Sequence, residues 1–162
     1  MEQADLFILI THCQYEKGNY QNRFRMNDRW HTMSVDAGLF PISSKRYVAH
    51  EKDWSKIKTN IQHDLSEFDP CINQSLVLTN FNVIKAIQKK LNINTEIITD
   101  YYTNLSSTAR LVHLCKTYKA TQYLSGVSGK KYLDTALFEK EGIEVIYQGK
   151  EKSKPIIQHI YA

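Results

Sequence analysis

The chain has 162 residues, of which 42% are hydrophobic and 23% are charged, a composition typical of one globular domain that buries its own core. It excludes an intrinsically disordered, collagen-like or coiled-coil protein, and no apolar run approaches the ~20 residues that a membrane span needs. The net charge of +4 comes from lysines and arginines spread along the chain, which disfavours nucleic acid as a partner and favours a small anionic ligand.

The N-terminal residues and the cysteines indicate the compartment. Residues 1–5 lack the basic and then apolar layout of a signal peptide, so we expect a cytoplasmic protein without a membrane partner. The three cysteines, Cys13, Cys71 and Cys115, include no CxxC pair. We therefore expect neither a disulfide framework nor a metal site, and no cofactor.

The first half of the chain contains three local patterns. Residues 6–10 are a short, continuous apolar run, which predicts a strand buried on both faces. Residues 30–35 alternate well enough to predict a second strand. Residues 56–65 carry apolar side chains at a spacing of four, which is one stripe of a helix that Asp53 is placed to cap.

In the second half, helical and strand patterns alternate. This order predicts right-handed crossovers and an α/β fold, a single domain with a mainly parallel sheet flanked by helices. The last three strands should then be mutually parallel neighbours. The predicted elements are a helix opening at Thr79 or Asn80, a strand at 96–99, a helix opening at Ser106 or Ser107, a strand at 121–124, a helix at 130–141 that Gly142 ends, and a strand at 143–147.

Four predicted strands turn polar at the point where they end. In an open parallel sheet the ligand sits outside the carboxyl ends of the strands, so these segments should share one rim. They are residues 11–14, 100–102, 125–129 and 148–149.

The segment from Ser125 to Gly129 is the most specific local signal. It joins a strand to a helix and holds two glycines, so Gly126 and Gly129 could let backbone N–H groups approach an anion while Ser128 caps the helix. An ordinary strand-to-helix turn would look the same in the sequence, and this alternative stays open.

Residues 14–25 are dense in amides, arginines and aromatic rings. Arg23 and Arg25 could clamp a phosphate or carboxylate, with Gln14 and Asn22 beside them as substrate-binding residues. A solvated hairpin is the alternative reading of the same residues.

His12 is the best candidate for a catalytic base, since histidine titrates near neutral pH and this one follows a strand at the predicted rim. The neighbouring Cys13 should point to the opposite face of an extended chain, and we expect it to be buried and inert. Asp100, the second candidate catalytic residue, and Tyr132 would orient the substrate.

Two blocks of the chain resemble the WbqC-like family. The first holds the strand from Asp5 together with Gln14-Tyr-Glu-Lys, Gln21-Asn-Arg23 and Arg25, and the second holds Ser107-Thr-Ala-Arg110-Leu and the string 120–134. The resemblance covers roughly residues 4–35 and 80–148. Family members usually carry a further segment before the first strand and two acidic residues at the place of Thr11-His12, so we expect a shortened, diverged member whose less covered sheet edge forms a homodimer.

The resemblance implies a WbqC-like domain over residues 1–162 and a role in surface-polysaccharide or modified-sugar metabolism. The implied chemistry is transfer of an acyl or aminoacyl group to an amino sugar, and the implied partner is an anionic or nucleotide-sugar substrate. Two alternatives stay open at this point. One is a non-catalytic relative that keeps the anion cradle, and the other is a weak nucleic-acid-binding protein.

Overall fold

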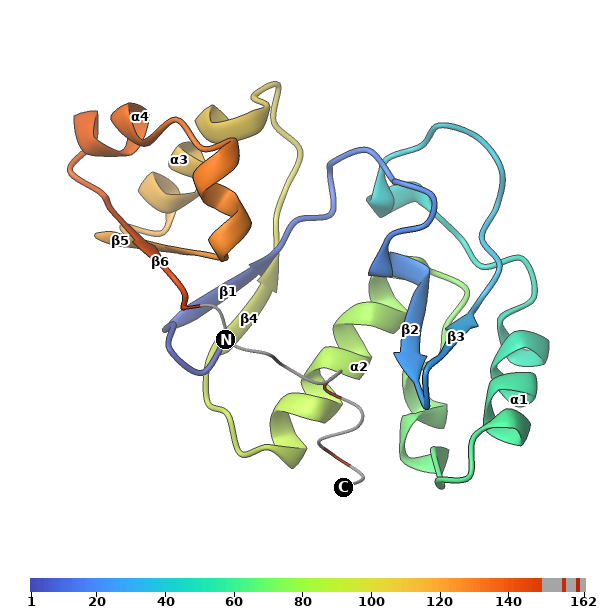
Figure 1. Cartoon of the computed structure of the whole chain (residues 1–162). Coiled ribbons are helices and arrows are strands. Elements are labelled where there is room, and N and C mark those ends of the chain that lie inside the picture. The colour runs from blue at the N-terminus through green and yellow to red at the C-terminus, as the bar shows by residue number, and fades with distance from the viewer. Residues whose placement is uncertain (150–155, 157–159, 161–162) are drawn as a thin grey trace. The chain divides into compact units, whose positions relative to one another are not determined.

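A computed structural model describes residues 1–149 together with Ile156 and Ile160. The chain divides into two compact units (Figure 1): unit 1 comprises residues 1–99 and 153–162, and unit 2 comprises residues 100–152. Each unit combines helices with a pair of parallel strands. The predicted α/β class is therefore confirmed.

Within its described residues up to position 99, unit 1 contains a parallel strand pair, a hairpin, two α-helices and three short 3-10 turns. Its elements are β1 (Leu6–Leu9), η1 (Tyr20–Asn22), β2 (Arg23–Met26), β3 (Arg29–Thr32), η2 (Ile42–Ser44), α1 (His50–Asn60), η3 (Ser66–Cys71), α2 (Leu76–Lys90) and β4 (Glu96–Thr99). The parallel direction predicted for the first strand is confirmed, since β1 pairs with β4 from Leu6 opposite Glu96 to Leu9 opposite Thr99. All four residues of β1 are half-buried rather than buried on both faces.

The hairpin of β2 and β3 forms because its turn residues accept a left-handed backbone. Asn27 and Asp28 have φ of 50° and 59°, the pattern of a two-residue turn that matches the twist of antiparallel strands. β2 and β3 pair from Arg23 opposite Thr32 to Met26 opposite Arg29. The hairpin that was the alternative interpretation of residues 14–25 is thus present at their C-terminal end.

Both long helices of unit 1 begin earlier than their sequence patterns predict. α2 begins at Leu76 because the hydroxyl of Ser75 accepts the N–H of Leu78 at 3.3 Å, which satisfies one of the first unpaired N–H groups of the helix. Thr79, predicted as the cap, is buried in the first turn. Asp53 likewise lies inside the first turn of α1 and accepts the N–H of Ser34 at 2.6 Å.

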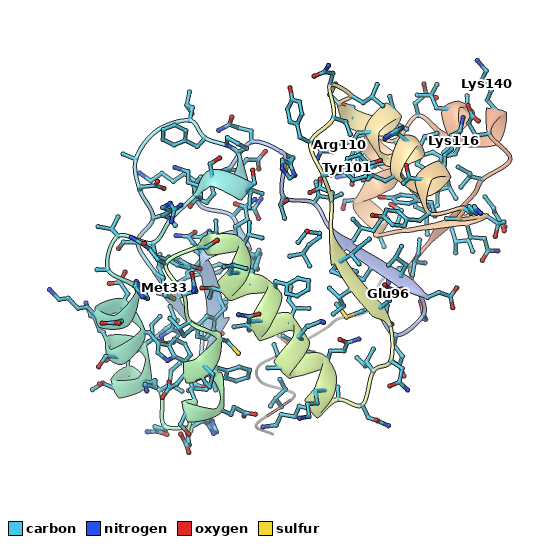
Figure 2. The ribbon with its side chains drawn as sticks, turned by 180° about the vertical axis from the view of Figure 1, so that it is seen from behind. Met33, Glu96, Tyr101, Arg110, Lys116 and Lys140 are labelled. Carbon is cyan, nitrogen blue, oxygen red and sulfur yellow. The ribbon has the colours of Figure 1, made fainter. Side chains whose placement is uncertain are left out.

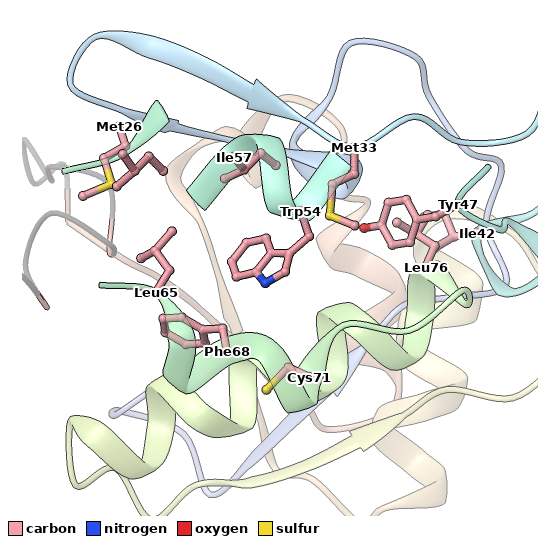
Figure 3. Packing of buried hydrophobic residues seen from close by; sticks show 11 residues of the cluster. Met26, Met33, Ile42, Tyr47, Trp54, Ile57, Leu65, Phe68, Cys71 and Leu76 are labelled. Atoms are coloured by element: carbon pink, nitrogen blue, oxygen red, sulfur yellow. The ribbon is translucent and has the colours of Figure 1, made fainter. Parts of the chain in front are cut away.

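The core of unit 1 lies between α1, η3, α2 and the inner face of the hairpin (Figure 3). Its most buried side chains are Met26, Leu65, Phe68 and Leu76, each no more than 2% exposed. Trp54 of α1 packs in the same cluster. These contacts join residues up to 50 positions apart and hold the hairpin against the helices.

Unit 2 is a smaller parallel strand pair covered by helices. Its elements are α3 (Ser107–Thr117), β5 (Gln122–Ser125), η4 (Val127–Lys131), α4 (Thr135–Lys140) and β6 (Glu144–Tyr147). β5 and β6 are parallel, with Gln122 opposite Glu144. A separate core contains Val112, Cys115, Phe138 and Ile143.

The predicted helix at 130–141 is in fact two pieces, and Ser128 caps neither. Ser128 lies inside η4, and α4 begins at Thr135, where the Asp134 carboxylate accepts the N–H of Ala136 at 3.2 Å. The helix breaks between the two pieces because Asp134 has an extended backbone, with φ of −85° and ψ of 95°. Gly142 ends α4 as predicted, with φ of 69°.

The predicted neighbourhood of the last three strands is confirmed for β5 and β6 but wrong for β4. In the described residues, β4 pairs with β1 instead. A helical crossover sets the direction of the next parallel strand, but it does not choose the strand's partner when another strand is nearby. The N-terminal strand supplies that partner here.

Among the helices in the described part of the chain, none is both long and apolar enough to cross a bilayer.

Candidate functional site

Unit 1 contains a cavity of about 350 Å³ whose walls come from the hairpin, α1, η3 and α2. The charged residues of the wall are Arg23 and Arg25, and no acidic side chain lines the cavity in the part of the chain that the structure describes. Most of the other wall side chains are apolar. They include Phe24, Met33, Phe68, Ile72, Val83 and Ile87.

The pairing of the hairpin determines which backbone groups its outer edge presents. The N–H of Met33 donates to the carbonyl of Asn22 at 3.0 Å, so the residues at 22, 24 and 26 exchange hydrogen bonds with β3. Residues alternate in an antiparallel pair, and the N–H and C=O groups of Arg23 and Arg25 therefore point away from β3. Within the described residues, no other strand pairs with that edge of β2.

Three of the predicted substrate-binding residues, Asn22, Arg23 and Arg25, thus line one cavity. The amide of Asn22 also supports the hairpin, since its Nδ2 donates to the carbonyl of Met33 at 2.8 Å and its Oδ1 accepts the hydroxyl of Tyr15 at 3.0 Å. A role for Asn22 in orienting a substrate stays a prediction.

The two arginines differ in how strongly the protein already engages them. Arg23 donates to the backbone carbonyls of Gly18 and, at 3.2 Å, Asn19, and its guanidinium lies 4.0 Å from the ring centroid of Trp30. Arg25 makes an ion pair of 3.2 Å with Asp28, whose side chain is 96% exposed. Such an exposed pair contributes little free energy, so Arg25 is the arginine that can turn to a ligand.

Further polar residues of the wall were not predicted, among them Gln21 and Asn80. The Oε1 of Gln21 is buried without a hydrogen-bond partner among the described residues, and Asn80 of α2 donates to the backbone carbonyl of Gln21 at 2.8 Å. Gln21 does lie in the amide-rich segment, which was a usable signal. Nothing in the sequence near Asn80 points to a residue 59 positions earlier in the chain.

His12 lies in unit 1, three residues after the end of β1. It is half-buried, and its Nδ1 is 3.2 Å from the hydroxyl oxygen of Thr11. Gln14, also in this segment, is exposed and donates to the carbonyl of Phe40 at 3.2 Å. The catalytic role of His12 and the binding role of Gln14 stay predictions.

The burial predicted for Cys13 is wrong, because this cysteine is exposed. The alternation of a strand no longer sets its direction, since β1 has already ended at Leu9. Cys71 and Cys115 are buried, and burial raises the pKa of both thiols. They are therefore poor nucleophiles at neutral pH.

In unit 2, Asp100 forms a buried ion pair with Arg110, which lies near the start of α3 and close to Tyr101 (Figure 2). Asp100 is 4% exposed and Arg110 is 7% exposed. Arg110 also donates to the carbonyl of Tyr101 at 3.3 Å. This geometry ties the segment after β4 to α3, so a substrate-orienting role for Asp100 would act through Arg110.

The turn predicted as an anion cradle also lies in unit 2. Gly129 is required by packing, because a Cβ there would overlap the hydroxyl of the buried Ser125. Gly126 has open space around its α-carbon, with nothing within 4 Å of an added Cβ. Ser128 and Tyr132 are exposed. The turn thus brings these residues together, and their contact with a ligand stays a prediction.

Among the described residues, no group of three or more His, Cys, Asp or Glu side chains is arranged to hold a metal ion.

Comparison with known proteins gives one family and one relative. The sequence profile of the WbqC-like protein family matches residues 1–158. A curated protein of Mycobacterium tuberculosis (strain ATCC 25618 / H37Rv), named "Uncharacterized protein Rv1507c", is 27% identical over 166 residues, which covers 89% of this chain and 72% of the relative. No solved structure matches the chain.

Proposed function

The chain belongs to the WbqC-like protein family, and from this premise we propose that it transfers an acyl or aminoacyl group to an activated amino sugar. The reaction would serve surface-polysaccharide or modified-sugar metabolism, as the family resemblance implies, and we expect it in the cytoplasm. The observation that carries the proposal is the cavity of unit 1, which combines an apolar wall with Arg23 and Arg25 and has no acidic wall residue among those described. An acyl group needs the apolar wall, and an anionic reactant is favoured by the arginines.

In the proposed reaction the sugar amine attacks the acyl carbonyl carbon. A C–N bond forms, the bond from the carbonyl carbon to the leaving group breaks, and the leaving group keeps that electron pair. His12 accepts the proton that the amine loses. Arg25 pairs with an anionic group of the reactants.

A non-catalytic relative that binds the same ligand is the second candidate. This candidate is favoured because two of the predicted site residues already have partners within the protein. Arg23 donates to the carbonyl of Gly18, and Asp100 pairs with Arg110. The two functions differ in what happens when His12 is replaced.

The test incubates the protein with a nucleotide-activated amino sugar and an acyl thioester, and mass spectrometry follows the N-acylated sugar. We expect H12Q to lower kcat by about 100-fold or more while the Kd for the sugar nucleotide stays within about twofold. The matched control is H63Q, at another half-buried histidine of unit 1. A wild-type protein that binds the sugar nucleotide but transfers no acyl group would support the second candidate, and full activity of H12Q would remove His12 from the mechanism.

A further inference from the structure

We propose that the cavity of unit 1 binds a straight acyl chain of medium length, with the chain against η3 and α2 and the carboxylate or carbonyl end at the outer edge of β2. This inference rests on the proposed function in one respect: it identifies the bound chain with the acyl group that is transferred. The binding itself requires no turnover.

The apolar side of the cavity suits a hydrocarbon chain. Phe68, only 2% exposed, and Ile72 come from η3 and the residue after it, while Val83 and Ile87 lie one turn apart on α2. A cavity of about 350 Å³ is at the small end of ligand-binding pockets. It is larger than an acetyl group needs, and its wall gives a gain in affinity for each methylene that leaves water.

The polar side of the cavity suits the head of an acyl chain. Among the described residues, the Arg25 guanidinium pairs with the exposed carboxylate of Asp28, which it can exchange for a carboxylate on the ligand. The backbone N–H groups of Arg23 and Arg25 point away from β3 and are further hydrogen-bond donors at the outer edge of β2. No acidic side chain lines the described wall, and Asp28, the carboxylate beside Arg25, is the 96% exposed group that the ligand head would replace.

A sugar fits the apolar side of the same cavity poorly. Each sugar hydroxyl that leaves water needs a hydrogen-bond partner, because an unpaired buried polar group is costly. The wall formed by Phe68, Ile72, Val83 and Ile87 has no such groups. The sugar would therefore lie at or beyond the polar wall residues Gln21, Asn22 and Asn80, which leaves the apolar part of the cavity to the acyl group.

The first experiment uses the unaltered protein and measures Kd by calorimetry for acetate, butyrate, hexanoate, octanoate and decanoate below their micellar concentrations. We expect Kd to fall by about fourfold for each added methylene until the chain fills the cavity, and then to level off. A Kd that does not depend on chain length would overturn the proposal. The proposal would also be overturned if an extended peptide bound tightly at the outer edge of β2 and octanoate did not displace the peptide.

Two pairs of comparisons locate the ends of the ligand. V83F should shorten the chain length at which Kd levels off and weaken octanoate by about tenfold or more, whereas V48F makes the same change at a position that is 68% exposed and outside the cavity wall. R25Q should weaken octanoate but leave the affinity for neutral octanamide within about twofold. If V83F does not fold, I87F tests the same wall from the next turn.

The outcome separates this inference from the proposed function. Chain-length-dependent binding without any transfer reaction would keep the cavity assignment and contradict the proposed function. Transfer of acetyl groups by a protein whose affinity ignores chain length would keep the function and contradict this inference.

Discussion

At the scale of one residue, Lys45 is a buried positive charge of unit 1 that is held by several partners. Its side chain is 1% exposed, and its Nζ donates to the carbonyls of Asp36 and Gly38 at 2.7 and 2.9 Å. The Asp36 carboxylate lies 3.6 Å away, and the ring centroid of Tyr15 is 5.0 Å away. A buried ammonium group is stable only with such partners, so Lys45 fixes the conformation of the loop at 36–40.

Replacing Lys45 should therefore destabilise the fold even when the new side chain is apolar. In K45M the carbonyls of Asp36 and Gly38 lose a charged donor and the Asp36 carboxylate loses its partner, which we expect to cost about 2–3 kcal/mol of unfolding free energy. Urea denaturation measures the change. The control is K52M, at an exposed lysine of α1, which should change the free energy of unfolding by less than about 0.5 kcal/mol. An equally small effect of K45M would show that Lys45 does not fix this loop.

At the scale of elements, Asp69 joins η3 to α1. The Nζ of Lys58 lies 2.7 Å from both carboxylate oxygens, and the indole N–H of Trp54 donates to Oδ1 at 2.6 Å. The hydrogen bond from Lys58 and then that from Trp54 hold the pKa of Asp69 below its usual value. The helix therefore depends on a carboxylate that must stay ionised.

This contact predicts how stability depends on pH. Because the folded pKa of Asp69 is lowered, its contribution is fully present above the unfolded pKa, near 4, and is lost as the pH falls through the folded value. D69N should be less stable than the wild type at neutral pH, and the difference should close below about pH 4. Urea titrations of both proteins between pH 7 and 2.5 test this; a difference that stays constant with pH would show that Asp69 acts only through its shape.

At the scale of the whole molecule, the two units have separate cores. Phe138 is fully buried in unit 2, where the ring of Tyr123 stacks on it with centroids 5.0 Å apart, and burial raises the pKa of Tyr123 to about 12. Phe68 has the corresponding place in unit 1. Because the two clusters contain different residues, their local stabilities can differ.

Hydrogen exchange of matched variants tests that separation. F138A should cost about 3–5 kcal/mol in the core of unit 2 and raise exchange within residues 100–149, with little change in residues 1–99. F68A should do the reverse. If either variant loosens both ranges equally, the molecule unfolds as one cooperative body.

The homodimer expected from the sequence also stays a prediction, and light scattering on the wild type tests it.

The sequence by itself determined those features that depend on near neighbours in the chain. The α/β class, the helix that opens after Ser106 and the end of α4 at Gly142 all follow from periodicity and from the backbone freedom of one residue. The family was also recognisable from short strings such as residues 120–134, because contiguous residues carry them.

The tertiary structure alone decided the partners of these elements and the surroundings of the site residues. β4 pairs with a strand some 90 residues earlier, Asp100 is held by Arg110, and Arg23 is occupied by its own loop. The cavity exists because η1, which leads into the hairpin, meets α2 across a long stretch of chain, as the bond from Asn80 to Gln21 shows. Burial and pairing of this kind are sums over distant contacts, and local sequence patterns carry no record of them.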